Sequence, residues 1–262
     1  MKRLCCMVAA VLAAAQLHAA PLDHGELVVF PTRAGVTQGL YVQTPSASPP
    51  LVVVIYCGGG GILRLNSAGP TQLHGNFVIR TAHYWVDKGY AAVLVDAPSD
   101  RQHKPMDDYY RLGKDALADQ RFVIEQVRKH FPRSKIVLLS TSRGTVTVGN
   151  VLQHVPELAD LYVLTSPLSI AARGPGIANL AVPPAMQGRT LLVSNKHDAC
   201  DISRYDGGKR LAERNHLAFI TEESSKGGGS PKADCGGHSP HGFLGVEDKT
   251  LDDINGWIGQ KL

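Results

Sequence analysis

The sequence of 262 residues lacks several features that would each indicate a particular class of protein. Its 27 basic and 23 acidic side chains are scattered, and no block of like charges suggests a nucleic-acid partner. It has no Gly-x-Gly-x-x-Gly or Gly-x-x-x-x-Gly-Lys-Ser/Thr motif, which disfavours a site for nucleotide phosphates. No apolar run reaches the roughly 20 residues that a membrane-spanning helix needs, so we expect no stable membrane anchor.

A shorter apolar run lies at the N-terminus, where it has the organisation of an export signal. Two basic residues come first, an apolar stretch follows, and two small residues end it. These parts are Lys2 and Arg3, residues 4–17, and Ala19 and Ala20. We therefore predict a signal peptide over residues 1–20, cleaved after Ala19 or Ala20. The mature chain of residues 21–262 is then expected in the periplasm or outside the cell.

Short apolar runs recur along the mature chain and predict the strands of a sheet. Most of them lack alternation of apolar and polar residues, which is typical of parallel strands buried on both faces. They cover residues 51–56, 90–95, 136–139, 161–164, 190–193 and 217–220. Two earlier segments, residues 26–32 and 37–44, lie on either side of Gly35 and predict an antiparallel hairpin at one edge.

Apolar residues at helical spacing predict helices between these strands. The three stripes are Leu112, Ala116, Val123 and Val127; Val148, Val151, Leu152 and Val155; and Leu251, Ile254 and Ile258. Alternation of strand and helix implies helices on both sheet faces. We predict a single α/β domain over residues 21–262, with a doubly wound, mostly parallel sheet of about eight strands.

Two connecting segments carry further expectations. Only about 25 residues separate the strands predicted at 161–164 and 190–193, and they include four prolines, so we expect no large helical lid there. The glycine- and serine-rich stretch over residues 224–230 predicts a mobile surface loop.

Ser142 is a candidate nucleophile because of its position between a strand and a helix. Residues 136–144 run Ile-Val-Leu-Leu-Ser-Thr-Ser-Arg-Gly, directly before an amphipathic helix. A strand-to-helix turn would expose the Ser142 hydroxyl, and the helix N-terminus would favour developing negative charge. Ser140 occupies the first glycine position of the motif Gly-x-Ser-x-Gly. The alternative is that Ser140 and Ser142 only cap the helix.

A run of four glycines, residues 58–61, follows the first buried strand. Glycines contribute no side-chain packing and cost chain entropy, so their value here is close backbone approach to a ligand. With the Ser142 turn, this loop resembles the α/β hydrolases, whose oxyanion hole uses such a loop and the amide after the nucleophile. The resemblance implies Gly58, Gly59 and Arg143 as the oxyanion donors. The family often has histidine before the glycines, where this chain has Cys57.

The resemblance also implies an acid and a base, in the chain order Ser, Asp, His. Asp198 lies a few residues past the strand predicted at 190–193, where the family carries its acid, and Asp201 is the alternative. His241 is similar to the family's His-Gly-Phe ending, and His238 is the alternative base. The predicted triad is therefore Ser142, Asp198 and His241.

The cysteines allow three interpretations. In an oxidising compartment, two of the three that remain after signal cleavage are expected to pair. We expect a disulfide between Cys200 and Cys235, because they flank the segments of the acid and the base, with Cys57 left free. One alternative is three unpaired buried thiols, and the other is a zinc site built from Cys200, Cys235, His238 and His241. It would leave the serine turn and the glycine loop unexplained, so no metal is predicted.

Together, these features predict a serine hydrolase that cleaves a small or medium ester through an acyl-enzyme on Ser142, without metal or cofactor. Its expected partner is a small-molecule ester or acyl substrate. A peptidase or lactone hydrolase with the same triad remains an alternative, as does a non-catalytic ligand-binding protein on this fold. Asp96, Asp100 and Arg101 follow the second buried strand and are either substrate contacts or a structural turn.

Overall fold

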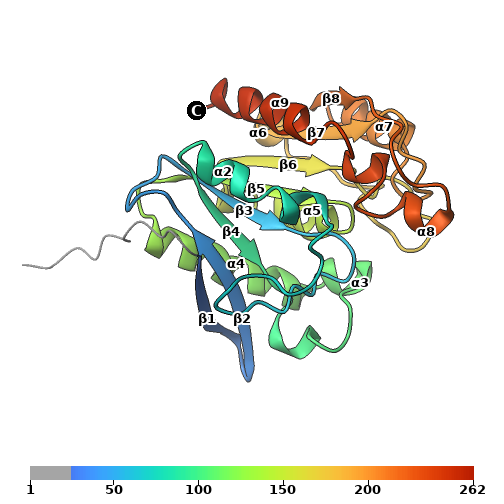
Figure 1. Cartoon of the computed structure of the whole chain (residues 1–262). Helices are drawn as coiled ribbons and strands as arrows, with labels where there is room; N and C mark the ends of the chain where they lie inside the picture. Colours follow the sequence, from blue (N-terminus) through green and yellow to red (C-terminus); the bar gives the residue numbers. More distant parts are fainter. Residues whose placement is uncertain (1–24) are drawn as a thin grey trace, which may run out of the picture.

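The computed structural model describes residues 25–262, which form one sheet of eight strands between layers of helices (Figure 1). The strands are β1 (Glu26–Arg33), β2 (Val36–Gln43), β3 (Leu51–Tyr56), β4 (Ala91–Val95), β5 (Lys135–Thr141), β6 (Leu161–Thr165), β7 (Thr190–Asn195) and β8 (Ala218–Glu222). Their order across the sheet is β1-β2-β4-β3-β5-β6-β7-β8. Strand β2 pairs antiparallel with β1 and β4, and the other pairs are parallel. The signal peptide predicted over residues 1–20 lies outside the described residues.

Helices cover both faces of this sheet. In the described part of the chain they are α1 (Phe77–Arg80), α2 (His83–Asp87), α3 (Asp108–Arg111), α4 (Lys114–His130), α5 (Gly144–His154), α6 (Pro184–Gln187), α7 (Tyr205–Arg214), α8 (Pro231–Asp234) and α9 (Glu247–Gly259). Helices α4, α5 and α7 pack on one face, and α1, α2 and α9 pack on the other. The predicted α/β architecture is confirmed. Across residues 25–262, no helix combines the length and apolarity needed to cross a membrane.

The central strand β3 shows why these strands are continuous apolar runs. All six of its residues are buried. Val52 and Val54 contribute to the core on one face, and Val53 and Ile55 contribute to the core on the other. A strand covered on both faces needs apolar side chains at consecutive positions, which is the pattern that the sequence predicted.

The first predicted helical stripe is interrupted, which corrects one expectation. Helix α3 ends at Arg111 and α4 begins at Lys114, so Leu112 lies between two helices. Its side chain is 38% exposed and does not join the buried stripe. Gly113, a poor helix former, is the N-cap of α4, and this break turns the chain between the two helices.

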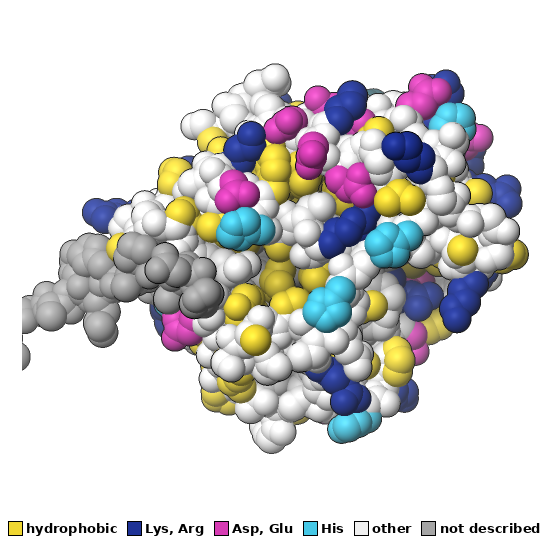
Figure 2. Space-filling view, viewed as in Figure 1, with side chains coloured by type: hydrophobic (Ala, Val, Ile, Leu, Met, Phe, Trp, Pro, Cys, Tyr) yellow, Lys and Arg dark blue, Asp and Glu magenta, His cyan; other side chains and the backbone are white. Residues whose placement is uncertain are grey.

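The segment between β6 and β7 contains no large lid, as predicted, and its one helix is α6, of four residues. Several of its apolar side chains pack into the core, namely Ile177, Leu180, Val182 and Met186. On the face drawn in Figure 2, a hollow with hydrophobic side chains at its floor is open to solvent. Histidine and basic side chains stand at the rim of this hollow.

Gly144, the last residue of the serine motif, allows α5 to begin directly against β3. A Cβ atom at this position would lie 2.7 Å from the carbonyl oxygen of Cys57 and even closer to that of Tyr56. Both neighbours are backbone atoms, which a side-chain rotation cannot move away. The glycine therefore sets how closely the start of α5 approaches the glycine loop after β3.

We expect Gly144→Ala to lower the free energy of unfolding by about 3 kcal/mol or more, because overpacking against backbone cannot relax. The matched control is Gly256→Ala in α9, where an added Cβ meets no atom within 4 Å. That change should raise the free energy of unfolding by about 0.5–1 kcal/mol through reduced chain entropy. Urea denaturation of both variants measures the difference, and equal stabilities would contradict the close approach.

Candidate active site

Ser142 occupies a tight turn between β5 and α5. It is half-buried and has a φ of 53°, in the left-handed region that a non-glycine residue enters at a cost of about 1–3 kcal/mol. Backbone hydrogen bonds hold the turn, since the Ser142 N–H donates to the Thr165 carbonyl at 3.0 Å. Thr145 donates its N–H and its hydroxyl to the Ser142 carbonyl, at 2.9 and 2.6 Å. The turn places the serine side chain beyond the carboxyl end of the strand.

The glycine loop lies directly against this serine. A Cβ atom at Gly58 would come within 2.9 Å of the Ser142 Cβ, so only glycine fits there. The Gly61 N–H donates to the Gly58 carbonyl at 3.2 Å and closes a turn in which Gly59 has a φ of 57°. Within residues 25–262, the N–H groups of Gly58, Gly59 and Arg143 hydrogen-bond to no protein group. Free backbone donors therefore lie beside the Ser142 side chain.

Arg111 donates a hydrogen bond to the glycine loop from the protein interior. Its buried guanidinium donates to the Gly59 carbonyl at 3.3 Å and to the Thr147 hydroxyl at 2.7 Å. Burial lowers the pKa of Arg111 to about 10, which still leaves the group protonated at neutral pH. This contact orients the Gly59 carbonyl toward the arginine.

Asp96 holds the segment that follows the glycine loop, which supports the structural role expected for it as one of two alternatives. Its Oδ1 accepts the Leu63 N–H at 2.7 Å and its Oδ2 accepts the Leu65 N–H at 3.0 Å. Asp100 forms an ion pair with Arg33 at 3.2 Å. The Arg101 guanidinium lies 4.0 Å from the Tyr110 ring centroid. All three residues of the predicted turn have structural partners.

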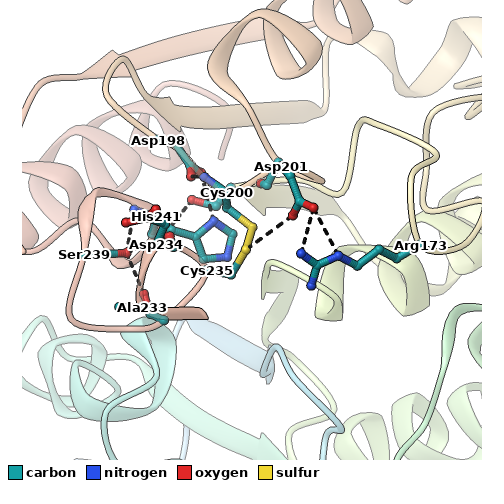
Figure 3. The surroundings of a disulfide bond; sticks show 12 residues. Arg173, Asp198, Cys200, Asp201, Ala233, Asp234, Cys235, Ser239 and His241 are labelled. Carbon is teal, nitrogen blue, oxygen red and sulfur yellow. Dashed lines mark hydrogen bonds and ion pairs between the residues drawn. A yellow bond between two sulfur atoms is a disulfide. The ribbon is translucent and has the colours of Figure 1, made fainter. Parts of the chain in front are cut away.

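Asp198 and His241 form a buried pair (Figure 3). Asp198 Oδ2 lies 2.8 Å from His241 Nδ1, and its Oδ1 accepts the Cys200 N–H at 2.9 Å. A carboxylate in this position favours a proton on Nδ1, which leaves the Nε2 lone pair free. His241 Nε2 is buried and has no hydrogen-bond partner among residues 25–262.

Neighbouring residues hold His241 in place. Its N–H donates to the buried Ser239 hydroxyl at 3.2 Å. The adjacent Gly242 packs so closely on the Gly237 carbonyl that no larger residue fits. Phe243 is fully buried, with its ring centroid 4.8 Å from that of Phe77. The residues that flank the histidine therefore anchor its loop in the core.

The end of β6 connects the serine turn to the histidine loop. The Thr165 carbonyl accepts the Ser142 N–H, and the next residue, Ser166, donates its hydroxyl to the His241 carbonyl at 2.7 Å. One dipeptide thus contacts both segments. Neither the Ser142 hydroxyl nor His241 Nε2 hydrogen-bonds to a group within the described residues.

Solved structures with a similar fold share little sequence with the chain. An α/β serine hydrolase without a lid from Xanthomonas campestris has 14% identity and a TM-score of 0.57, over 90% of this chain and 97% of its own. A cold-adapted esterase from an Arctic intertidal metagenomic library has 12% identity and a TM-score of 0.50, over 76% and 83%. Dipeptidyl peptidase 4 from Porphyromonas gingivalis has 14% identity and a TM-score of 0.50, over 76% of this chain and 31% of its own. The chain has the α/β-hydrolase fold. No protein-family model matches the sequence, and no curated protein is significantly similar to it.

Asp201 and His238, the alternative candidates, take no part in the contact between Asp198 and His241. Asp201 forms an ion pair with Arg173 at 2.7 Å, and both side chains are exposed (Figure 3). His238 is exposed, and its ring lies against Gly75. Neither shares the buried contact that joins Asp198 to His241.

Cys200 and Cys235 form the disulfide expected from the sequence (Figure 3). Cys200 lies two residues after Asp198, and Cys235 lies six residues before His241. The bond therefore ties the loop that carries Asp198 to the loop that carries His241. Because both sulfurs are engaged in it, they are not thiolate ligands for the alternative zinc site. Cys57 is buried and free, and burial raises its pKa to about 12, which disfavours the reactive thiolate.

The glycine-rich segment over residues 224–230 contributes to the site in a way that sequence reasoning missed. It packs against the histidine loop, where the Gly228 N–H donates to the His238 carbonyl at 3.3 Å. The Ser224 hydroxyl donates to the Leu244 carbonyl at 2.5 Å. A Cβ at Gly227 would collide with the His238 carbonyl. The run of glycines in the sequence could have indicated this packing, because glycine permits close backbone approach as well as the mobile loop that we predicted.

Non-reducing peptide mapping of the exported protein should show Cys200 joined to Cys235 and Cys57 free. Reduction should lower the free energy of unfolding by about 3–4 kcal/mol, because the bond closes a loop with a sequence separation of 35. Urea denaturation with and without reductant measures this loss. Three reduced thiols with stoichiometric zinc retained after dialysis would contradict the pairing.

Proposed function

We propose that the protein is a serine hydrolase that cleaves small or medium carboxylic esters through an acyl-enzyme on Ser142. The observation that carries this proposal is the buried contact between Asp198 and His241, which leaves the buried Nε2 without a partner. A buried ring nitrogen without a hydrogen bond is costly unless another molecule or a reacting group uses it. In this proposal the reacting group is the Ser142 hydroxyl, because the serine turn and the His241 loop both contact the carboxyl end of β6.

In the proposed reaction, His241 Nε2 accepts the Ser142 proton while the serine oxygen attacks the ester carbonyl. Asp198 stabilises the imidazolium that forms. The N–H groups of Gly58, Gly59 and Arg143 donate to the developing oxyanion, and one such donor typically contributes about 3–4 kcal/mol. The imidazolium then returns its proton to the leaving alcohol. Water releases the acid in a second cycle of the same steps and restores the free serine.

Two further observations support an ester of modest size. The short β6–β7 connection leaves no helical lid of the kind that buries long acyl chains. The similar solved structures include a serine hydrolase without a lid and an esterase. The disulfide supports a periplasmic or secreted location, because such bonds persist in oxidising compartments.

A fluorophosphonate probe should label the mature protein at Ser142, because it reacts with a serine activated by a neighbouring base. Ser140, the matched control, is buried in β5 and should carry no label. Mass spectrometry of labelled peptides locates the modification. Labelling that persists in Ser142→Ala would overturn the assignment, and an inert protein would favour the ligand-binding alternative.

Replacing His241 with alanine should lower kcat for ester hydrolysis by several orders of magnitude, because the proton acceptor is lost. The matched control, His238→Ala, removes an exposed ring and should lower kcat about tenfold or less, which corresponds to about 1 kcal/mol. Both variants are compared at equal concentrations of folded protein. A larger loss from His238→Ala would show that the base had been assigned to the wrong histidine.

A further inference from the structure

Arg143 follows the proposed nucleophile, and its side chain extends to a second group of charged residues. Its Nε lies 3.0 Å from Asp108 Oδ1 in an ion pair. The Asp108 side chain is 4% exposed, whereas that of Arg143 is 28% exposed. The guanidinium is therefore fixed at one end by a buried carboxylate, while part of it faces solvent beside the site.

The hydrogen-bonding capacity of this arginine is unused. A guanidinium has five N–H donors, and within residues 25–262 no group accepts a hydrogen bond from that of Arg143. The other Asp108 oxygen already accepts the Gly176 N–H at 3.0 Å. The adjacent Asp107 carboxylate is turned toward the start of α3, where it accepts the Tyr110 N–H at 2.8 Å. The terminal nitrogens of Arg143 thus remain available to an incoming acceptor.

A second arginine, Arg111, adds positive charge close to Arg143. The donors of buried Arg111 contact neutral acceptors, namely the Gly59 and Met106 carbonyls and the Thr147 hydroxyl. Among the described residues, no carboxylate lies within ion-pair distance of it. Asp96 and Arg111 line one small cavity, and both Asp96 oxygens accept hydrogen bonds from backbone N–H groups. Within residues 25–262, Asp108 is therefore the one carboxylate that forms an ion pair with either guanidinium group, and its partner is Arg143.

We infer that the Arg143 guanidinium binds a carboxylate on the substrate, so that the enzyme prefers esters whose acyl group ends in a carboxylate. The inference rests on the proposed ester hydrolysis at Ser142. Guanidinium and carboxylate match in a planar, two-point contact, which suits a group held at one edge by Asp108. Because the Arg143 amide is also a proposed oxyanion donor, one residue would orient the acyl group at both of its ends.

The test compares the p-nitrophenyl half-ester of adipic acid with p-nitrophenyl heptanoate, which is similar in length and uncharged. After subtraction of spontaneous hydrolysis, kcat/KM of the wild-type protein should be at least about tenfold higher for the charged ester, since a hydrogen bond to a charged group typically contributes about ten- to a hundredfold. Arg143→Gln should reduce this ratio at least tenfold, mainly through KM. Arg143→Lys should restore part of it.

Two further variants control for charge and folding. Arg121→Gln removes an exposed arginine on α4 and changes net charge equally, so the ratio should stay at the wild-type value. The double variant Asp108→Asn/Arg143→Gln leaves no uncompensated buried carboxylate and should lose the preference as Arg143→Gln does. A wild-type preference for the neutral ester, or an unchanged ratio in both Arg143→Gln variants, would overturn the inference.

Binding measured without turnover separates this inference from the proposed function. Calorimetric titration of Ser142→Ala with adipate should show binding that the added Arg143→Gln change weakens at least tenfold. If adipate binds in this way but the wild-type protein cleaves neither ester, the proposed ester hydrolysis fails and the carboxylate site stands. If the neutral ester is cleaved and adipate does not bind, the carboxylate site fails and the hydrolysis stands.

Discussion

The contact between Asp198 and His241 joins two loops that leave the sheet after different strands, and much of the surrounding structure holds these loops together. Both side chains are buried, so the carboxylate would be costly without partners. Its two oxygens meet the His241 ring and the Cys200 N–H. The disulfide then fixes the Asp198 loop to the segment before His241, and Ser166, the residue after β6, donates a hydrogen bond to the His241 carbonyl. The disulfide thus joins the two loops covalently, and hydrogen bonds hold the His241 loop at the end of β6.

The serine side of the site depends on a different constraint, the close approach of backbone to backbone. Gly144 lets α5 begin against the end of β3, and Gly58 lets the glycine loop pass beside Ser142. The left-handed conformation at Ser142 is unfavourable by itself, and the hydrogen bonds to Thr165 and from Thr145 offset that cost. Such a turn persists because the surrounding structure holds it in place.

Two buried charged residues hold the glycine loop in place. Their replacement would therefore change the position of the loop, without removing a group of the site itself. Asp96 accepts backbone N–H groups from the segment after the loop, and Arg111 donates to the loop carbonyl at Gly59. A buried guanidinium without a carboxylate partner is unfavourable in a core, and its three neutral acceptors reduce that cost. The positive charge retained there also favours negative charge nearby, which would suit the proposed oxyanion and the proposed substrate carboxylate.

The sequence by itself determined the strand segments, the longest helices α4, α5 and α9, the serine turn and the glycine loop. These features depend on local spacing, since consecutive apolar residues form strands buried on both faces and glycine permits close approach. Element boundaries were less certain: Leu112 fits the spacing of a helical stripe but lies in a break between α3 and α4. Only the tertiary structure decided which carboxylate meets which histidine, that Asp96 supports a loop, and that residues 224–230 pack against the histidine loop. Those outcomes depend on contacts between segments far apart in the chain, and local residue patterns do not encode which of two nearby side chains points into the site.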